Sequence, residues 1–421
     1  MGQARPGARV TLQDVADRAG VSLTTASRVV NDGSRRVGQP LADRVHQAVA
    51  ELGYTANLQA RAVATGQSSM VGVVVHDIAD PYFATIAAGL IEVADARNLL
   101  VCMSSTKATE AAEREYVALM RAQRARAVIL IGSRTDDMPA RDALRAEIAA
   151  FTRQGGRAVC IGQDLLGVDT ILPENAGSAE ALARAMVALG HRRFAVLAGP
   201  RGLLTARDRL DGFRAGLAAW SVPLDPARVI YGAFTRDGGY EAMSAILAAG
   251  EPLPDCVFAV TDVMALGALA RLRAGGLAVP DDVALAGFDD IATLRDVHPP
   301  LTTVRLPLKQ MGEMAAGLVL SDAPLVTPNT PNTPNTPRVI PVPGEVILRD
   351  STIPRPPALS RPHPTTPLRT KSHIRYVSLN WKALASVRGL GARPRQRPEP
   401  IMWERVTALL TVSPGHAHDP Y

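Results

Sequence analysis

The first fifty residues of the chain show a helical period of apolar and polar positions. Between residues 12 and 19, apolar side chains recur at i, i+3, i+4 and i+7, the spacing of one helix face. Thr11, with Asp14 three residues later, predicts an acidic capping box at the start of this helix, and Gly20 predicts a left-handed ending. The apolar positions are Leu12, Val15, Ala16 and Ala19.

Two further helices are predicted after a tight turn. Ser22 is expected to cap the second helix. The third helix is expected from Pro40 to Leu52, because proline suits a first helical position and Gly53 suits an ending. This pattern predicts an all-α head that contains a helix-turn-helix. The inward positions are Ala26, Val29 and Val30 in the second helix and Leu41, Val45, Ala48, Val49 and Leu52 in the third.

In a helix-turn-helix the second helix lies in the major groove of DNA. Arg28 is expected to donate two hydrogen bonds to a guanine, and Leu23 to touch a thymine methyl group. Ser22 and Thr25 suit phosphate contacts, which set the register without reading sequence. The alternative is an ordinary three-helix subdomain with an incidental arginine. The candidate DNA-contacting residues of the head are Thr11, Ser22, Leu23, Thr24, Thr25, Ser27, Arg28 and Asn31.

From Met70 onward, short apolar runs alternate with amphipathic helices, which predicts parallel sheets covered on both faces. The units exceed one sheet, so two doubly wound α/β subdomains are expected. The predicted strands are Val71–His76, Leu99–Met103, Ala127–Ile131, Ala158–Ile161, Phe194–Ala198, Cys256–Val260 and Val283–Gly287, with a strand-like run at Arg338–Leu348. The predicted helices are Ala84–Arg97, Ala111–Arg124, Gly177–Leu189, Ala206–Ala219, Gly238–Ala249 and Met264–Ala274.

Two runs of sequence, VTLQDVADRAGVSLTTASRVVN and ELGYTANLQARAVATGQSSMVGVVV, resemble the start of a LacI/GalR-family transcriptional regulator. The resemblance extends to about Arg349 and implies a hinge that becomes helical on operator DNA and wedges the minor groove. Asn57, Ala60 and Arg61 match the hinge pattern, whereas Val63 stands where leucine is usual. Valine is shorter and β-branched, so a weaker or shallower kink is expected. The alternative is that residues 57–69 are only a linker.

The resemblance also implies a domain plan with a periplasmic-binding-protein-like body. We expect a DNA-binding head at residues 1–56 and a hinge at 57–69. An effector-binding and dimerisation domain is expected at 70–350. Its N-subdomain is placed at about 70–163 and 291–325, and its C-subdomain at about 164–290 and 338–350. Residues 351–421 are rich in Pro and Arg and are expected to be a disordered tail.

Ligands of such folds bind outside the carboxyl ends of the strands, in the cleft between subdomains. Asp289 and Arg209 resemble the family's effector-contacting residues. Carboxylates and a guanidinium beside aromatic rings suit a sugar. The alternative is that Asp289 and Asp290 cap the next helix and that Arg209 makes a local salt bridge. The candidate effector residues are Tyr82, Phe83, Arg209, Phe234, Asp262 and Asp289.

One departure from the family concerns Leu306, which stands where many members have glutamine, so a polar contact to the effector is expected to be missing. The effector therefore cannot be carried over from a relative.

Charge is divided unevenly along the chain, whose net charge is +6. Residues 1–66 hold eight Arg against five acidic residues, and residues 355–421 hold eleven Lys and Arg against three. The central body is therefore acidic, which fits a DNA-binding head on a sensor, with an affinity that falls as salt rises. Neither a secretion signal nor a membrane span is evident, so a cytoplasmic location is expected. Cys102, Cys160 and Cys256 are expected to be buried, reduced thiols.

No motif for catalysis is evident: there is no phosphate loop, no GxSxG elbow and no HExxH. We therefore expect neither an enzyme nor a bound cofactor or metal, and His191 is expected to be structural. Adjacent carboxylates such as Asp289 and Asp290 should diverge. The PNTPNTPNTP tract at 328–337 is expected to be a tolerated surface insertion. The basic tail either adds nonspecific attraction to DNA or has no role.

These observations predict an effector-responsive transcription regulator, usually a repressor in the family. Its expected partners are a near-palindromic operator duplex, a small molecule such as a sugar, and a second copy of the chain. Assembly beyond the homodimer, and whether the effector releases or strengthens DNA binding, stay open. A solute-binding protein of a transport system is the alternative, but it has no use for residues 10–64. An enzyme acting on nucleic acid would lack a catalytic constellation.

Overall fold

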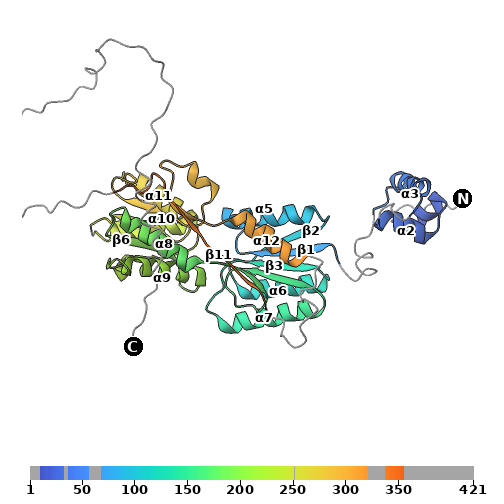
Figure 1. Ribbon diagram of the computed structural model, residues 1–421, viewed down its shortest axis with the longest axis horizontal. Coiled ribbons are helices and arrows are strands. Elements are labelled where there is room, and N and C mark those ends of the chain that lie inside the picture. Colours follow the sequence, from blue (N-terminus) through green and yellow to red (C-terminus); the bar gives the residue numbers. More distant parts are fainter. Residues whose placement is uncertain (1–9, 33–36, 56–67, 251, 321–336, 355–421) are drawn as a thin grey trace, which may run out of the picture. The chain divides into compact units, whose positions relative to one another are not determined.

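The computed structural model describes residues 10–32, 37–55, 68–250, 252–320 and 337–354, with the side chains of residues 31 and 32 excepted (Figure 1). Several predictions fall outside this part of the chain. They are the hinge residues Asn57, Ala60, Arg61 and Val63, the side chain of Asn31, the PNT tract and the basic tail.

The head contains the three predicted helices. The Thr11 hydroxyl accepts from the Asp14 N–H at 3.3 Å and the Asp14 carboxylate accepts from the Thr11 N–H at 2.8 Å, so the capping box is confirmed. Gly20 has a φ of 62°, which confirms the left-handed ending. Leu41, predicted to face inward, is exposed, and Ala42 is buried in its place. The helices are α1 (Leu12–Ala19), α2 (Leu23–Asp32) and α3 (Gln39–Leu52).

The first sheet of the body has six parallel strands in the order β11-β5-β4-β3-β1-β2. Helices α5 and α12 pack together, as do α6 and α7, and the two pairs cover opposite faces, because Ile129 and Leu130 of β3 belong to different hydrophobic clusters. The strands are β1 (Met70–Val75), β2 (Leu100–Ser105), β3 (Ala127–Ile131), β4 (Arg157–Ile161), β5 (Asp169–Pro173) and β11 (Val339–Val342). The helices are α5 (Pro81–Asp95), α6 (Glu110–Ala122), α7 (Met138–Arg153) and α12 (Leu308–Leu320).

The second sheet has four parallel strands in the order β7-β6-β8-β9, and α8 pairs with α9 while α10 pairs with α11. A two-stranded antiparallel ribbon, β10 with β12, forms its own ladder, and isolated bridges join Thr302 to Ala286 of β9 and Arg305 to Asp289. The strands are β6 (Phe194–Gly199), β7 (Val229–Tyr231), β8 (Cys256–Ala259), β9 (Ala284–Ala286), β10 (Thr303–Arg305) and β12 (Glu345–Ile347). The helices are α8 (Asn175–Ala188), α9 (Leu204–Ala218), α10 (Arg236–Ala248) and α11 (Asp262–Ala274).

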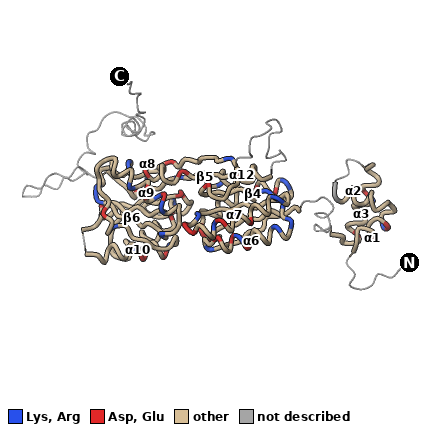
Figure 2. Tube along the Cα trace, turned by 90° about the horizontal axis from the view of Figure 1, so that it is seen from below, with Lys and Arg blue, Asp and Glu red and all other residues tan. Residues whose placement is uncertain are grey.

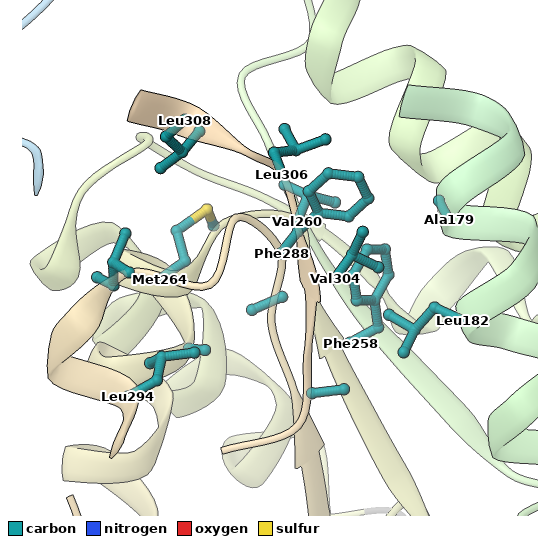
Figure 3. Packing of buried hydrophobic residues seen from close by; sticks show 14 of the residues in the cluster. Ala179, Leu182, Phe258, Val260, Met264, Phe288, Leu294, Val304, Leu306 and Leu308 are labelled. Carbon is teal, nitrogen blue, oxygen red and sulfur yellow. The ribbon is translucent and has the colours of Figure 1, made fainter. Parts of the chain in front are cut away.

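Aromatic rings fill the core of the second subdomain. Phe213 stacks on Phe258 with ring centroids 4.5 Å apart and meets Phe194 edge-on at 5.7 Å. Val304 and Leu306 lie near Phe258 and Phe288 in the same hydrophobic cluster (Figure 3). Leu306 is therefore a core residue, which explains why an apolar side chain is tolerated there.

The two subdomains do not divide where the sequence predicted. Strands β5 and β11 belong to the first sheet. The sequence had placed both of them in the C-subdomain, β5 within residues 164–290 and β11 within residues 338–350. Residues 291–305, assigned to the N-subdomain, run beside the second sheet, with bridges from Ala286 to Thr302 and from Asp289 to Arg305. The predicted run Arg338–Leu348 is broken near Gly344, and its halves pair in different sheets.

The chain therefore crosses between subdomains three times: after β5, after β10 and after β11. Gly344 lies at the last crossing, where its N–H donates to the Ser178 hydroxyl at 2.9 Å. An added Cβ on Gly344 would lie 2.5 Å from a Val304 methyl, so the crossings are packed too closely for a larger residue.

The three cysteines are free. Cys160 and Cys256 are buried as predicted, and burial raises the pKa of the Cys160 thiol to about 11. Cys102 is only partly buried, because β2 is the edge strand of its sheet.

A fully buried ion pair links the loop after β3 to α6. Arg134 donates to both Glu113 carboxylate oxygens, one bond measuring 2.9 Å, and both side chains are almost free of solvent contact. Burial alone would raise the pKa of Glu113, but the charge of Arg134 and its hydrogen bonds hold that pKa below its ordinary value. The pair tolerates burial because each charge compensates the other.

Arg134→Met leaves Glu113 buried without its main partner and is expected to lower the free energy of unfolding by about 3–5 kcal/mol. Urea unfolding followed by circular dichroism measures the change. A second change, Glu113→Leu, should restore much of the loss, since it removes the orphaned charge. If Arg134→Met were as stable as the parent, the attraction of Arg134 would not be what offsets the cost of burying the Glu113 charge.

Candidate functional site

Helix α2 presents a polar face to solvent in the head. Leu23 is 46% exposed, Thr24 and Arg28 are also exposed, and Ser27 and Thr25 are partly exposed. No carboxylate among the described side chains of the head pairs with Arg28, whose guanidinium carries five N–H donors. Val15, Ala26 and Val29 are buried behind this face, which orients it outward.

Two of the predicted contact residues also cap helices. The Ser22 hydroxyl accepts from the Thr25 N–H at 3.1 Å and lies 2.8 Å from the Thr25 hydroxyl. Thr11 caps α1, and the hydrogen bonds of its N–H and its hydroxyl hold the pKa of Asp14 below its ordinary value. These hydroxyls remain on the surface, and the helix starts that they fix are the elements that offer N–H groups to phosphates.

A pocket lies at the carboxyl ends of the strands of both sheets. The space within it that the centre of a water molecule can occupy amounts to about 50 Å³. That is room for a few waters and too little for a sugar, so this conformation must widen to take one. First-subdomain lining residues are His76, Asp80, Tyr82, Phe83, Gly132, Ser133, Ile161, Gly162 and Pro173. Second-subdomain lining residues are Asn175, Thr205, Arg209, Phe234, Thr261 and Asp289.

Arg209 of α9 is the most constrained side chain of this pocket. Its guanidinium donates to the Asn175 side-chain oxygen at 2.9 Å, the Val260 carbonyl at 2.7 Å and the Asp289 carboxylate at 2.8 Å. Its Cζ lies 3.8 Å from the centroid of the Phe288 ring. The arginine thereby holds together the start of α8, the end of β8 and the loop after β9.

Asp289 adopts a φ of 124°, in the region that favours glycine, and Asp290 follows at 59°. Such backbone strain at two successive non-glycine residues is typical of functional sites. Burial raises the pKa of Asp289 to about 7, although the charge and hydrogen bond of Arg209 act in the opposite direction.

The neighbouring carboxylate points elsewhere, as predicted. Asp290 accepts from Arg305 at 2.7 Å and from Arg349 at 2.5 Å. Burial opposes ionisation, but these two hydrogen bonds keep the pKa of Asp290 below its ordinary value. The following short helix starts after Ile291 without a side-chain cap, so neither aspartate has the alternative capping role.

Aromatic side chains line both sides of the pocket. Tyr82 and Phe83 begin α5 and meet edge-on with centroids 5.0 Å apart. Burial raises the pKa of the Tyr82 phenol, so it stays protonated and can donate a hydrogen bond. Phe234 lies against Gly199, where an added Cβ would lie 2.0 Å from a ring carbon.

Asp262 does not belong to the pocket lining, contrary to the prediction. Its carboxylate accepts from the Thr303 hydroxyl at 2.7 Å and from the Ile291 N–H at 2.9 Å. Burial, followed by the charge of Asp289, raises its pKa well above the ordinary value. Asp262 therefore supports the loop that carries Asp289 rather than facing the pocket.

Sequence reasoning missed several polar lining residues. His76 and Ser133 follow β1 and β3, Asn175 follows β5, and Thr261 follows β8. Asp80 caps α5 by accepting from the Tyr82 N–H at 2.9 Å, and burial raises its pKa. The position directly after a strand was the available signal, because ligands bind at that edge of parallel sheets.

Within the part of the chain that the structure describes, no helix is both long and apolar enough to cross a membrane.

Comparison with protein families finds two matches. The model of bacterial regulatory proteins of the lacI family matches residues 11–57, and the periplasmic binding protein-like domain matches residues 183–352. The match to the head separates the chain from a solute-binding protein, the alternative raised by the sequence.

Curated relatives are transcriptional regulators. CelR of Thermobifida fusca is 34% identical over 319 residues, which is 74% of this chain and 91% of the relative. GalR of Escherichia coli (strain K12) is 31% identical over 313 residues, 74% of this chain and 89% of the relative. Both are named HTH-type transcriptional regulators.

Solved structures agree with these relatives. The lac repressor dimer bound to operator and the anti-inducer ONPF has a TM-score of 0.68 and 26% identity, covering 82% of this chain and 100% of the other. A CelR–cellobiose complex has a TM-score of 0.57 and 29% identity over the same shares.

Relatives of this identity, matched over about nine-tenths of their length, are regulators and not enzymes. The chain belongs to the LacI family of DNA-binding transcriptional regulators.

Proposed function

We propose that this protein is a homodimeric, cytoplasmic repressor that binds a near-palindromic operator and responds to a neutral sugar. The observation that carries the proposal is the strained Asp289, joined to Arg209 in a pocket that both subdomains line. The sugar would bind between the two subdomains, which the three crossings connect. The first comprises residues 70–173 and 308–342, and the second comprises residues 175–305 and 345–352.

The chemistry of the lining favours a neutral ligand. When both are ionised, Asp80 and Asp289 outnumber Arg209, which already pairs with Asp289, so an anionic ligand would then meet uncompensated negative charge. Hydroxyl groups can donate to these carboxylates, and the faces of Tyr82 and Phe234 can pack against C–H groups of a sugar ring. The similar solved structure of a CelR regulator is a complex with cellobiose, which is consistent with this class of ligand.

The head would bind DNA through α2, with Arg28 over a base edge and Ser22 and Thr25 near phosphates. The lac repressor dimer on its operator supports a two-fold arrangement of two such heads. Asn57, Ala60, Arg61 and Val63 would enter the minor groove between the half-sites, as the family resemblance implies.

Coupling between the two ligands would arise from a shift between two states of the body. The pocket is too narrow for a sugar as it stands, so a bound sugar must favour a conformation with a wider pocket. The chain enters the first subdomain from the head at β1. A change in the angle between the subdomains would therefore change the relative positions of the two hinges in a dimer. Effector and DNA then influence each other's affinity by the same factor.

The test starts with the full-length protein and a thermal-shift screen of neutral sugars, sugar acids and sugar phosphates. A neutral sugar should raise the melting temperature and change affinity for a duplex from the protein's own promoter region. Asp289→Asn should abolish both responses and retain DNA binding, because the head is unchanged. A preference for anionic sugars, or an unchanged response of the variant, would overturn the assignment.

Arg28→Ala is expected to weaken operator binding by about 1–3 kcal/mol, because the bidentate hydrogen bonds to a base edge disappear. Nonspecific affinity should stay nearly constant. Fluorescence anisotropy on operator and scrambled duplexes measures both affinities. Arg18→Ala is the matched control, because Arg18 is an exposed arginine of α1 that pairs with Glu51. Equal losses on both duplexes would rule out base reading by Arg28.

Asp289 should also make the stability of the body dependent on pH. Its folded pKa of about 7 exceeds the ordinary 3.8, so the folded state holds an extra proton between these values. The free energy of unfolding should therefore fall as pH rises from about 4 through 7. Asp289→Asn should flatten this slope, measured by urea unfolding from pH 5 to 8.

Asp262 contributes to the pH dependence of stability in the same direction, because its pKa is also raised. Asp262→Asn is therefore measured beside Asp289→Asn. Only the slope is diagnostic, because Asp289→Asn also removes the partner of a buried arginine. A slope equal to that of the parent would show that Asp289 is ionised throughout.

A further inference from the structure

The two edges of the six-stranded sheet carry opposite charge. At the carboxyl ends of its strands the loops are acidic, with Asp77, Asp80, Asp136, Asp137 and Asp164. At the amino ends, where α5, α6 and α7 finish and β1, β3 and β4 begin, arginine predominates. Figure 2 shows Lys and Arg positions gathered at one end of the subdomain labelled β4, α6 and α7. The arginines at this edge are Arg97, Arg121, Arg124, Arg126, Arg153 and Arg157.

Part of this edge is hollowed. Arg121, Arg124 and Arg126 line a depression beside Phe151 and Gly156, and about 450 Å³ of it can hold the centre of a water molecule. Arg121 donates to Glu147 at 2.7 Å. Arg124 and Arg153 are exposed, and no carboxylate among the described residues pairs with either. We call Arg121, Arg124, Arg126 and Arg153 the arginine edge.

The backbone of Arg124 is unusual for its residue type. Each of the three helices that end here is followed by a residue in the left-handed region: Asn98 at 53°, Arg124 at 52° and Gly155 at 91°. Asparagine and glycine are the usual residues in this conformation, whereas arginine is disfavoured there. A cation within the last turn of α6 would be enough to complement the helix dipole. The dipole therefore does not explain why an arginine occupies position 124, beyond the helix and in a backbone conformation that disfavours it.

The edge is also where the chain arrives from the head. The Arg126 N–H donates to the carbonyl of Met70, the first residue of β1, at 2.8 Å. Twelve residues lie between Thr55, at the end of the described head, and Ser68, so these two residues are at most about 45 Å apart. Residues 55–69 contain Arg61 and no acidic residue, and the C-terminal tail is basic. These two segments therefore carry no net negative charge.

We propose that the arginine edge binds the phosphate backbone of the DNA that flanks the half-site held by the head. The inference rests on the operator binding proposed above. Guanidinium groups match phosphate oxygens in geometry and charge, and neutralising phosphates releases condensed counterions. Such contacts add affinity without reading sequence, so they complement the base contacts of α2.

The test uses the full-length protein and two duplexes selected for wild-type binding, one trimmed to the half-sites and one with extended flanks. Arg124→Gly removes the charge and suits the left-handed backbone, so its melting temperature should not fall. Arg124→Gly with Arg153→Gln enlarges the effect. Arg145→Gln is the matched control, an exposed arginine earlier on α7.

On the extended duplex, Arg124→Gly should reduce the slope of log affinity against log salt by about 0.9 for each phosphate that is no longer neutralised, or about 2 for a dimer. The reduction should be equal for operator and scrambled flanked duplexes. On the trimmed duplex, Arg124→Gly and wild type should agree, and Arg145→Gln should match wild type on both.

Equal salt slopes for wild type and both arginine-edge variants on the extended duplex would overturn this proposal while operator binding stands. Failure of the wild type to prefer any operator would instead remove the proposed function itself. A third outcome would identify a site for a small anion. In that case inorganic phosphate, added at constant ionic strength, raises the melting temperature of the wild type but not of Arg124→Gly, and the salt slopes of DNA affinity are equal for the two proteins. That result also overturns the proposal.

Discussion

The pocket at the carboxyl ends of the strands depends on one buried guanidinium. Arg209 connects Asn175 at the first crossing, the Val260 carbonyl after β8 and Asp289 after β9, and it lies over the ring of Phe288. A buried arginine is stable only when its donors are satisfied, so these partners are fixed relative to one another. The strained backbone at Asp289 persists because this network and Asp262, through the Ile291 N–H, hold the loop.

The raised pKa of Asp289 follows from the same arrangement. One arginine faces two carboxylates, Asp80 and Asp289, in a small pocket, and the burial of Asp289 outweighs its attraction to Arg209. An ionised or protonated Asp289 offers different hydrogen bonds to a sugar hydroxyl. The pocket therefore combines a fixed donor with an acceptor whose protonation state changes near neutral pH.

Strand direction separates the two charge environments of the first subdomain. All six strands are parallel, so every loop after a strand lies at one edge and every helix end at the other. The acidic loops surround the pocket, and the arginine edge lies where the chain enters β1. The buried strands between them, such as β3 with five residues free of solvent contact, form a rigid connection between the two edges.

The amino-acid sequence by itself determined the elements with strong local signals. The capping box of Thr11 and Asp14 and the left-handed Gly20 depend on residues a few positions apart, and β3 is a continuous apolar run, so each was predicted within a residue or two. Arg209 and Asp289 were found from family resemblance, whereas Asp80, Ser133 and Asn175 could have been found from their positions at strand ends and at the start of α5.

Only the tertiary structure decided where the chain crosses between subdomains and which carboxylate faces the pocket. Strands of three to five residues, such as β5, β10 and β12, resemble loops in sequence. β10 and β12 pair across 40 to 44 residues, and β5, besides its near neighbour β4, pairs with β11 across 169 residues. Asp262 and Asp289 both follow strands, yet the hydroxyl of Thr303 and the guanidinium of Arg209 assign them different roles. Pairing across such separations depends on packing, which no local pattern of residues contains.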